Sequence, residues 1–255
     1  MPTSSGIELG APTDALPSGS TAKSLVVLQA LAQAGGAVQL AELARDCGIS
    51  KTTVHRVLAG LRRLAWVRVH EGGRYSLGPQ AYAFAAMASR GTSVEQALAG
   101  LRDTVGHTVH AGVLLDDHVV YTHKLDGRDQ FVMRSRVGAS APLHCTAMGK
   151  ALLAHLPDDQ VSAVVAAGLP RRTTGTLTDP QAVLAELRGI RERGYAVEDE
   201  ENEPNIRCVA TVVPVTLGHP LRAVSISTVT FLTDREQLMS YVPALLHCAR
   251  SMTAD

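Results

Sequence analysis

Residues 38–64 constrain the fold most, because their apolar side chains recur at helical spacing in two short runs that a glycine separates. The first run consists of Leu40, Leu43, Ala44 and Cys47, and the second of Val54, Val57, Leu58, Leu61 and Leu64. Gly48 has the backbone freedom that a helix exit requires, and Ser50 is a favourable N-cap for the next helix. The pattern predicts two amphipathic helices joined by a tight turn.

The outward face of the second predicted helix is basic and hydroxylated. Its side chains are Lys51, Thr52, His55, Arg56, Arg62 and Arg63. A short second helix of this kind after a glycine turn is typical of a helix-turn-helix that reads DNA. Two packed helices with a merely solvated basic face would give the same pattern, so this segment alone leaves both interpretations open.

A predicted hairpin follows the second helix and favours the first interpretation. Trp66–His70 and Arg74–Leu77 read as strands, and Glu71–Gly73 supplies the turn. A hairpin at this place is the wing of a winged helix-turn-helix. An apolar period also predicts a helix upstream, at Leu25, Leu28 and Leu31. We therefore predict a winged helix-turn-helix over residues 21–78 that binds duplex DNA.

We expect the early turns of the second helix to enter the major groove. The candidates for base edges or flanking phosphates, counting the cap residue, are Ser50, Lys51, Thr52, Thr53, His55 and Arg56. Arginine can bind guanine O6 and N7 in a bidentate manner, and threonine can offer a hydrogen bond or a methyl group. Lys23, Arg68 and Arg74 are candidates for phosphate contacts. Alternatively, Thr53 is a buried helix residue, and Arg62 and Arg63 are plain solvated surface.

The charge of the chain is unevenly distributed, although the formal net charge of its 255 residues is zero. Residues 21–90 contain nine Lys or Arg and three Asp or Glu, whereas residues 91–255 carry a net charge of −4. The length leaves room for two domains. A basic module joined to an acidic one suits a DNA anchor linked to a domain that does not touch DNA.

Other features of the sequence bear on the cellular compartment and on the processing of the chain. Residues 1–20 are rich in Pro, Gly, Ser and Thr without an apolar period, which predicts a disordered leader rather than a signal peptide. We see no apolar run of membrane-spanning length. The four cysteines have no CxxC pairing or disulfide spacing, which is typical of a reducing compartment. We therefore expect a cytoplasmic chain that does not enter a membrane.

The rest of the chain predicts a linker helix and an α+β domain. Residues 79–92 contain an Ala-rich helical stretch that ends at Gly91, and residues 93–255 form the second domain. Strands are predicted at His110–Leu115, Val119–Lys124, Phe131–Val137, Cys208–Val215 and Arg222–Thr228. Helices are predicted at Val94–Val105, after Thr146 as N-cap, from Asp179-Pro180 to Arg193, and over a single final segment from Leu238 to Ala249. Strands grouped with helices in this way favour an antiparallel sheet.

Four stretches resemble a known family. RVGASAPLHCTAMGKALLA (136–154) and RGYAVEDEENEPNIRCVATVVP (193–214) are similar to signature blocks of the IclR family of bacterial transcription regulators. AELARDCGISKTTVHRVLAGL and YSLGP (75–79) match the same family, and the resemblance covers roughly residues 21–252. It implies an N-terminal winged helix, a linker helix and a C-terminal effector-binding domain related to GAF and PAS folds. It also implies a homodimer or homotetramer on a near-palindromic operator.

The resemblance also implies an effector site. The predicted helix start after Thr146 offers free N–H groups that suit a carboxylate. In the family, the residues that match Ala147 and Met148 contact small acids through the main chain, and Glu198 and Cys208 correspond to pocket residues. Ser225 and Ser227 lie beside them on the last strand. Glu198 stands where the family often has Asp. Because aromatic residues are only 4% of the chain, we expect aliphatic pocket walls, a polar end and a small organic acid as ligand.

Other interpretations compete at these positions. His144 can simply hold its loop together, Cys208 can be an ordinary core thiol, and Glu198–Glu201 can be a solvated acidic turn. His144 and Cys145 could suggest a cysteine-dependent enzyme, but adjacent residues on an extended chain point in opposite directions. The chain has no GxSxG, HExxH or glycine-rich phosphate loop, so we expect no catalytic, metal or cofactor site. A DNA-binding redox sensor that uses Cys145 and Cys208 is the remaining alternative.

Overall fold

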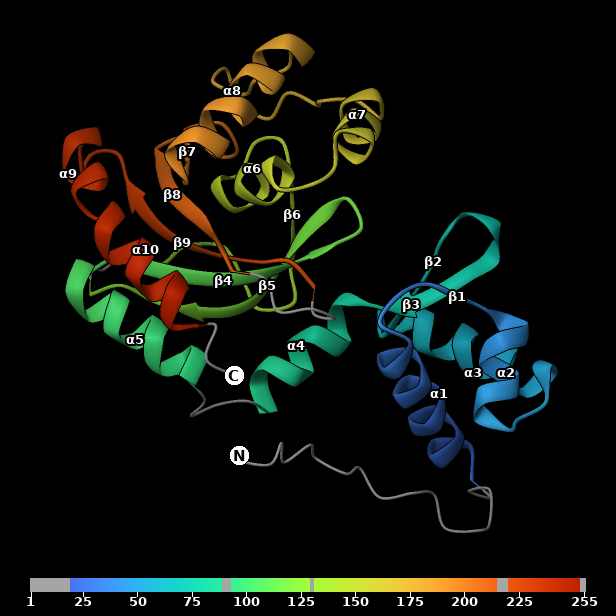
Figure 1. Ribbon diagram of the computed structural model, residues 1–255. Coiled ribbons are helices and arrows are strands. Elements are labelled where there is room, and N and C mark those ends of the chain that lie inside the picture. The colour runs from blue at the N-terminus through green and yellow to red at the C-terminus, as the bar shows by residue number, and fades with distance from the viewer. Residues whose placement is uncertain (1–18, 89–92, 129–130, 215–219, 253–255) are drawn as a thin grey trace, which may run out of the picture. The chain divides into compact units, whose positions relative to one another are not determined.

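The computed structural model describes residues 19–88, 93–128, 131–214 and 220–252 (Figure 1). The chain divides into two compact units, Met1–Gly78 and Pro79–Asp255. Most of the predicted leader, residues 1–18, lies outside the described residues, as does the predicted end of the linker at residues 89–92.

The first unit is a helix-turn-helix with a wing, as predicted, and a short strand before α2 extends the predicted hairpin to three strands. Its elements are α1 (Ser20–Ala34), β1 (Val38–Gln39), α2 (Leu40–Cys47), α3 (Lys51–Arg63), β2 (Val67–Val69) and β3 (Arg74–Leu77). The strands are antiparallel in the order β1-β3-β2. The three helices share one apolar core, whose most deeply buried side chains are Val27, Leu31, Leu43, Val54 and Leu58.

The turn residues of this unit adopt the conformations that the sequence requires. Gly48 ends α2 in the left-handed region, with φ of 64°. The Ser50 hydroxyl accepts a hydrogen bond from the Thr53 N–H at 3.4 Å and so caps α3. At the tip of the wing, Gly72 and Gly73 have φ of 72° and 70°. These residues therefore fix where α3 begins and where the hairpin turns.

The second unit is built on a six-stranded antiparallel sheet in the order β6-β5-β4-β9-β8-β7. Its strands are β4 (Thr108–Leu115), β5 (His118–Leu125), β6 (Ser140–Pro142), β7 (Ala196–Asp199), β8 (Ile206–Val213) and β9 (Arg222–Val229). Its helices are α4 (Pro79–Ala88), α5 (Ser93–Val105), α6 (Ala147–Ala154), α7 (Asp158–Ala166), α8 (Pro180–Arg193), α9 (Arg235–Ser240) and α10 (Val242–Ser251). The predicted α+β class with an antiparallel sheet is confirmed.

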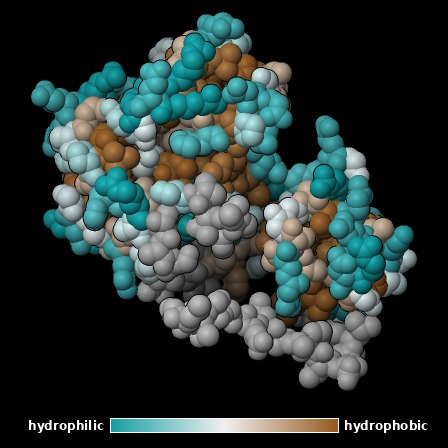
Figure 2. All heavy atoms as spheres, viewed as in Figure 1, coloured by the Kyte–Doolittle hydropathy of each residue, from teal (hydrophilic) through white to brown (hydrophobic). Residues whose placement is uncertain are grey.

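Helices cover both faces of this sheet. One face packs against α6, and α8 and Val161 of α7 join the same core behind it, whereas the opposite face packs against α5 and α10. On β8 the alternation is direct, because Ala210 joins the first core and Val209 and Val213 join the second. In the space-filling view, the outer faces of the helices are largely hydrophilic and apolar residues show between them (Figure 2).

The Ala-rich helix α4 packs on β5 of the second unit. Tyr82 contacts the apolar group formed by Val113, Leu115 and Val120. Ala83 is only 3% exposed, and an added Cβ at Gly138 would lie 3.1 Å from its methyl group. Because Gly138 has no side chain, α4 can approach the chain that leads into β6.

Two sequence predictions in this unit were wrong. Phe131–Val137 is not a strand, because β6 occupies the edge of β5 and side chains hold the segment instead. Lys124 Nζ donates to the Met133 carbonyl at 2.8 Å, and Ser135 Oγ lies 2.7 Å from His110 Nε2. The final helix is two helices, α9 and α10, which meet at Tyr241 because Pro243 cannot continue a helix that began earlier.

Gly149 in α6 provides a test of the close packing between α6 and the chain before it. A Cβ at this position would lie 2.5 Å from the Leu143 carbonyl oxygen and 2.5 Å from Thr146 Oγ1. We expect Gly149→Ala to lower the free energy of unfolding by about 1–3 kcal/mol, as overpacking does. Gly100→Ala, in the open middle of α5, should instead raise it by about 0.5–1 kcal/mol. Urea unfolding of both variants measures this, and a stabilised Gly149→Ala would contradict the packing.

Candidate functional site

The predicted base-reading residues occupy the first turns of α3. Lys51, Thr52, His55 and Arg56 are all exposed. Thr53 differs, because it is half-buried and its hydroxyl lies 3.0 Å from Ser50 Oγ. Ser50 and Thr53 are thus engaged with each other at the start of the helix, whereas the other four side chains are directed to solvent.

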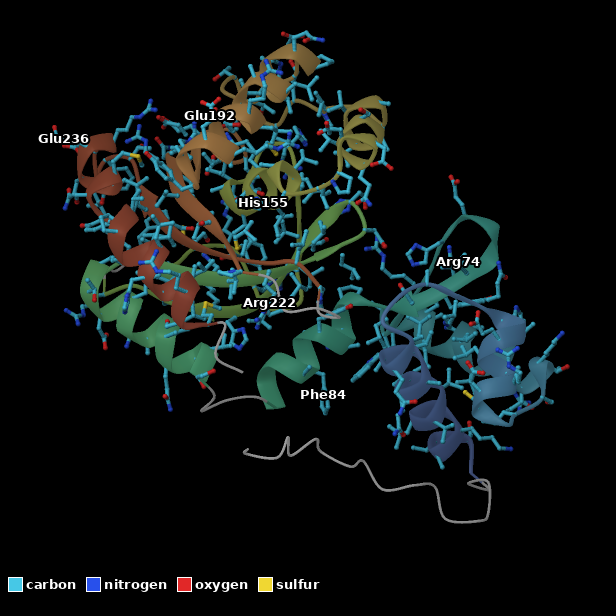
Figure 3. The ribbon with its side chains drawn as sticks, in the orientation of Figure 1. Arg74, Phe84, His155, Glu192, Arg222 and Glu236 are labelled. Atoms are coloured by element: carbon cyan, nitrogen blue, oxygen red, sulfur yellow. The ribbon has the colours of Figure 1, made fainter. Side chains whose placement is uncertain are left out.

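The predicted phosphate-binding residues lie at three separate places in the first unit. Lys23 is half-buried in the first turn of α1, and Arg68 is half-buried on β2. Arg74, at the start of β3 on the wing (Figure 3), donates a hydrogen bond to the Ala37 carbonyl. Arg74 therefore also ties the wing to the chain before α2. Arg62 and Arg63 are exposed at the end of α3.

Strand register gathers small polar side chains on the sheet face that meets α6. Cys208 on β8 pairs with Glu198 on β7 and with Ser227 on β9. Ser225, two residues along β9, pairs with His110 on β4. Successive side chains of a strand point to opposite faces of the sheet. The polar row therefore lies on one face, and its neighbours on β9, Val224 and Ile226, point into the core on the other face.

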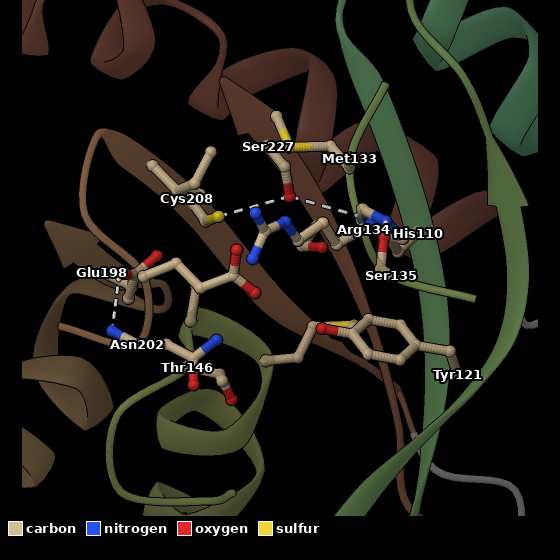
Figure 4. Close-up of a pocket in the computed structure, with 15 residues that line it drawn as sticks. His110, Tyr121, Met133, Arg134, Ser135, Thr146, Glu198, Asn202, Cys208 and Ser227 are labelled. Carbon is tan, nitrogen blue, oxygen red and sulfur yellow. Dashed lines mark hydrogen bonds between the residues drawn. The ribbon is translucent and has the colours of Figure 1, made fainter. Parts of the chain in front are cut away.

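This polar row forms the floor of a pocket (Figure 4) with about 510 Å³ of free space, including its open mouth. All six residues predicted for the effector site line it: Ala147, Met148, Glu198, Cys208, Ser225 and Ser227. The structure thus brings together residues from α6, β7, β8 and β9.

Sequence reasoning missed six polar residues that line the same pocket. They are His110, Tyr121, Arg134, Ser135, Asn202 and Glu203. Asn202 and Glu203 lie within a quoted signature block, and Arg134 and Ser135 directly precede another, but nothing in the pattern marked them. Among the described residues, the apolar side chains that line the pocket are Met133, Ala147, Met148 and Ile206, and most of the other lining residues are polar.

The helix start on one side of the pocket is capped as predicted. Thr146 Oγ1 accepts from the Gly149 N–H at 3.1 Å and donates to the Pro142 carbonyl at 2.7 Å. Among the described residues, the N–H groups of Ala147 and Met148 have no such acceptor, as is usual for the first turn of a helix. Both residues line the pocket, so their N–H groups are available to an acceptor there.

Glu198 is the most deeply buried acid of the pocket, with 2% of its surface exposed. Its Oε1 accepts hydrogen bonds from the Glu201 N–H at 2.7 Å and the Asn202 N–H at 3.1 Å. Burial raises the pKa of Glu198 to about 7, although these hydrogen bonds partly oppose the shift. Glu198 is therefore partly protonated near neutral pH, and the alternative of a solvated acidic turn does not hold for it.

A chain of hydrogen bonds connects the pocket floor with the segment before β6. Cys208 Sγ lies 3.2 Å from Ser227 Oγ, which lies 3.3 Å from His110 Nδ1. Nε2 of the same ring meets Ser135. Burial lowers the pKa of His110 to about 3, so the ring is neutral and donates from one nitrogen only.

A buried ion pair fixes the loop after β7, which carries Asn202. Lys150 on α6 is 1% exposed, and its Nζ binds Glu201 Oε1. Glu186 on α8 lies 3.8 Å from the same Nζ and is bound by Arg193 at 2.6 Å. Because Glu201 also donates its N–H to Glu198, this ion pair supports the pocket directly.

The geometry does not favour the enzyme and redox alternatives. His144 Nε2 meets the Pro170 carbonyl at 3.0 Å, so the ring holds its loop, as one alternative had it. Burial raises the pKa of Cys145 to about 12 and also raises that of Cys208. Both thiols therefore stay protonated, and a protonated thiol reacts slowly with oxidants. Within the described residues, no helix is long and apolar enough to cross a membrane.

The raised pKa of Glu198 makes a pH-dependent prediction. The folded state keeps this proton up to about pH 7, whereas the unfolded chain releases it near 4.5. Folding is therefore favoured most below the unfolded pKa, and this contribution is lost as pH rises toward 7. Relative to Glu198→Gln, the wild type should lose roughly 2–3 kcal/mol of unfolding free energy between pH 5 and 8. Denaturant unfolding across this range measures it. Glu192→Gln, on the outside of α8 (Figure 3), is the control that should leave the wild-type profile unchanged.

Comparisons with known proteins agree with this architecture. The family described as "Bacterial transcriptional regulator IclR C-terminal" matches residues 91–254, and the "IclR helix-turn-helix domain" matches residues 20–71. The two matches together cover both units of the chain.

Relatives and solved structures match over nearly the full length. The HTH-type transcriptional regulator KdgR of Escherichia coli (strain K12) is 33% identical over 242 residues, which are 92% of each chain. The transcriptional repressor IclR of the same organism is 29% identical and spans 92% of this chain and 88% of its own. The structure of the Thermotoga maritima IclR aligns with a TM-score of 0.61 at 28% identity, covering 91% of this chain and 96% of that one. The chain therefore belongs to the IclR family of bacterial transcriptional regulators, which bind DNA through an N-terminal helix-turn-helix.

Proposed function

We propose that this regulator binds a small organic acid in the pocket of the second unit and that the bound acid changes its affinity for operator DNA. One observation carries the proposal. Six residues singled out by resemblance, from four different elements, converge on one pocket. The two N–H groups at the start of α6 supply hydrogen-bond donors of the kind that a carboxylate accepts. The acid is an effector rather than a substrate, since the relatives are transcriptional regulators.

For DNA, we propose that α3 enters the major groove and that residues 21–78 form the binding domain. The exposed side chains Lys51, Thr52, His55 and Arg56 are the candidates for base contacts, with Ser50 and Thr53 fixing the helix start. Lys23, Arg68 and Arg74 are the candidates for phosphate contacts. Such a protein works in the cytoplasm, where the operator is.

We further propose that the protein acts as a homodimer or homotetramer on a near-palindromic operator. One recognition helix reads too few base pairs for useful specificity, so paired winged helices at a defined spacing are required. An effector alters operator affinity only if it binds one subunit arrangement more tightly than the other. The residues 93–255 then form the domain through which this preference acts.

Arg56 provides a test of the DNA-reading face. If Arg56 binds a guanine edge, Arg56→Ala should weaken binding to the operator by about 1–3 kcal/mol. Binding to random duplex should change much less. Arg63→Ala, also exposed but at the far end of α3, is the matched control. Fluorescence titrations at fixed salt on a site selected from random DNA measure both, and an equal loss on both kinds of DNA would make Arg56 a phosphate contact.

Cys208 provides a test of the effector site. We expect Cys208→Ser to weaken the response to an acid found by a thermal-shift screen, because it changes the hydrogen bond to Ser227 inside the pocket. Operator binding without ligand should stay close to normal. Cys248→Ser is the control, because Cys248 is buried in the core on the other face of the sheet and does not line the pocket. If the full chain with Cys208→Ser responds as the wild type does in calorimetry and operator titration, the proposed site is wrong.

A further inference from the structure

The pocket contains one basic side chain that has no acidic partner within the described residues. Arg134 lies in the segment between β5 and β6, and its exposed side chain lines the pocket (Figure 4). In the part of the chain that the structure describes, it belongs to none of the ion pairs, which join other Lys, Arg and His side chains to acids. A guanidinium in this position is a ready partner for an anion.

The acidic side chains of the pocket come from a different element. Glu198 and Glu203 both line it from the chain around the β7–β8 turn. Each can accept a hydrogen bond from a ligand hydroxyl when ionised. A second carboxylate on the ligand would instead meet Glu203 and the ionised fraction of Glu198 as like charges. The pocket therefore suits a ligand with one carboxylate, bound at Arg134, better than a ligand with two.

Two hydroxyl groups of the pocket also lack a hydrogen bond within the described residues. Ser225 is 3% exposed, and no side-chain hydrogen bond of its hydroxyl is formed there; the same holds for the Tyr121 hydroxyl. By contrast, Ser135, Ser227 and Thr146 are already bound to protein groups. A ligand without polar groups would remove water from Ser225 and Tyr121 without replacing it, which is unfavourable.

We infer that the effector is a small hydroxylated monocarboxylic acid and that Arg134 determines this specificity by binding its carboxylate. Its hydroxyl groups bind Ser225, Tyr121 and the Glu198 carboxyl. This inference rests on the proposed function and narrows the class of acid. Arg134 pairs with the single carboxylate of the ligand, and Glu198 and Glu203 disfavour a second carboxylate. The hydroxyl groups of Ser225 and Tyr121 require polar groups on the ligand.

A matched set of four-carbon compounds tests the class of ligand. The hydroxy acids L-threonate and D-erythronate are compared with butyrate, which lacks hydroxyls, with erythritol, which lacks the carboxylate, and with tartrate, which has two carboxylates. Calorimetry on the full chain should show at least one hydroxy acid binding about tenfold or more tightly than each of the other three, since a hydrogen bond to a charged group is worth at least that much. Butyrate or tartrate binding as tightly would overturn the inference, and so would no binding by either hydroxy acid at millimolar concentration.

Variants then test the residues. Arg134→Gln should weaken the preferred hydroxy acid by about tenfold or more and leave erythritol unchanged. Ser225→Ala should weaken the hydroxy acid and leave butyrate unchanged. Arg136→Gln, in the same segment but outside the pocket lining, is the control with wild-type binding. An unchanged affinity in Arg134→Gln would overturn the role of Arg134.

Operator titration in the presence of each compound separates the two hypotheses. If butyrate or tartrate binds and shifts operator affinity, the proposed function stands and the ligand class is wrong. If the hydroxy acid binds in an Arg134-dependent manner and operator affinity does not change, the inference about the pocket stands and the proposed function is wrong.

Discussion

The buried ion pair between Lys150 and Glu201 is the contact on which the second unit depends most. It joins α6 to the loop after β7, and Glu186 brings α8 to the same ammonium group. Removing one partner of such a pair leaves an uncompensated charge in the interior, which is strongly destabilising. The pair also has a local consequence, because the Glu201 N–H that it positions holds the Glu198 carboxylate. Two walls of the pocket are therefore fixed by one interaction.

The first unit was predictable from the sequence because its signals are local. Gly48, Ser50 and the two glycines of the wing each act within a few residues, and the apolar periods of α2 and α3 are short-range patterns. The pocket is different. The six lining residues that were predicted came from long motifs shared with a family. His110 and Tyr121, in contrast, reach the pocket through antiparallel pairing of β4 with β9 and β5. No periodicity along the chain reveals such register.

The errors have the same origin. Phe131–Val137 begins with three apolar residues, as a strand can, yet a strand exists only where an edge is free to pair, and β6 takes that edge. The composition of the whole chain did not reveal how many polar residues line the pocket, because a pocket samples only a few residues. Here β4, β8 and β9 place small polar side chains on one face and branched apolar ones on the other. Thr53 was named as a candidate DNA contact with a buried helix residue as the alternative, and in the structure this half-buried residue has its hydroxyl 3.0 Å from Ser50 Oγ.

The segment that contains Met133, Arg134 and Ser135 is held by side-chain hydrogen bonds to Lys124 and His110 rather than by strand pairing. Residues in a ladder are constrained by their neighbours on both sides, so a change in one disturbs packing across the sheet. Residues in this segment are not constrained in that way. Substitutions there can reshape one wall of the pocket while the sheet, the core and the subunit fold persist. A scaffold of this kind can acquire a new signal molecule during evolution without having to be rebuilt.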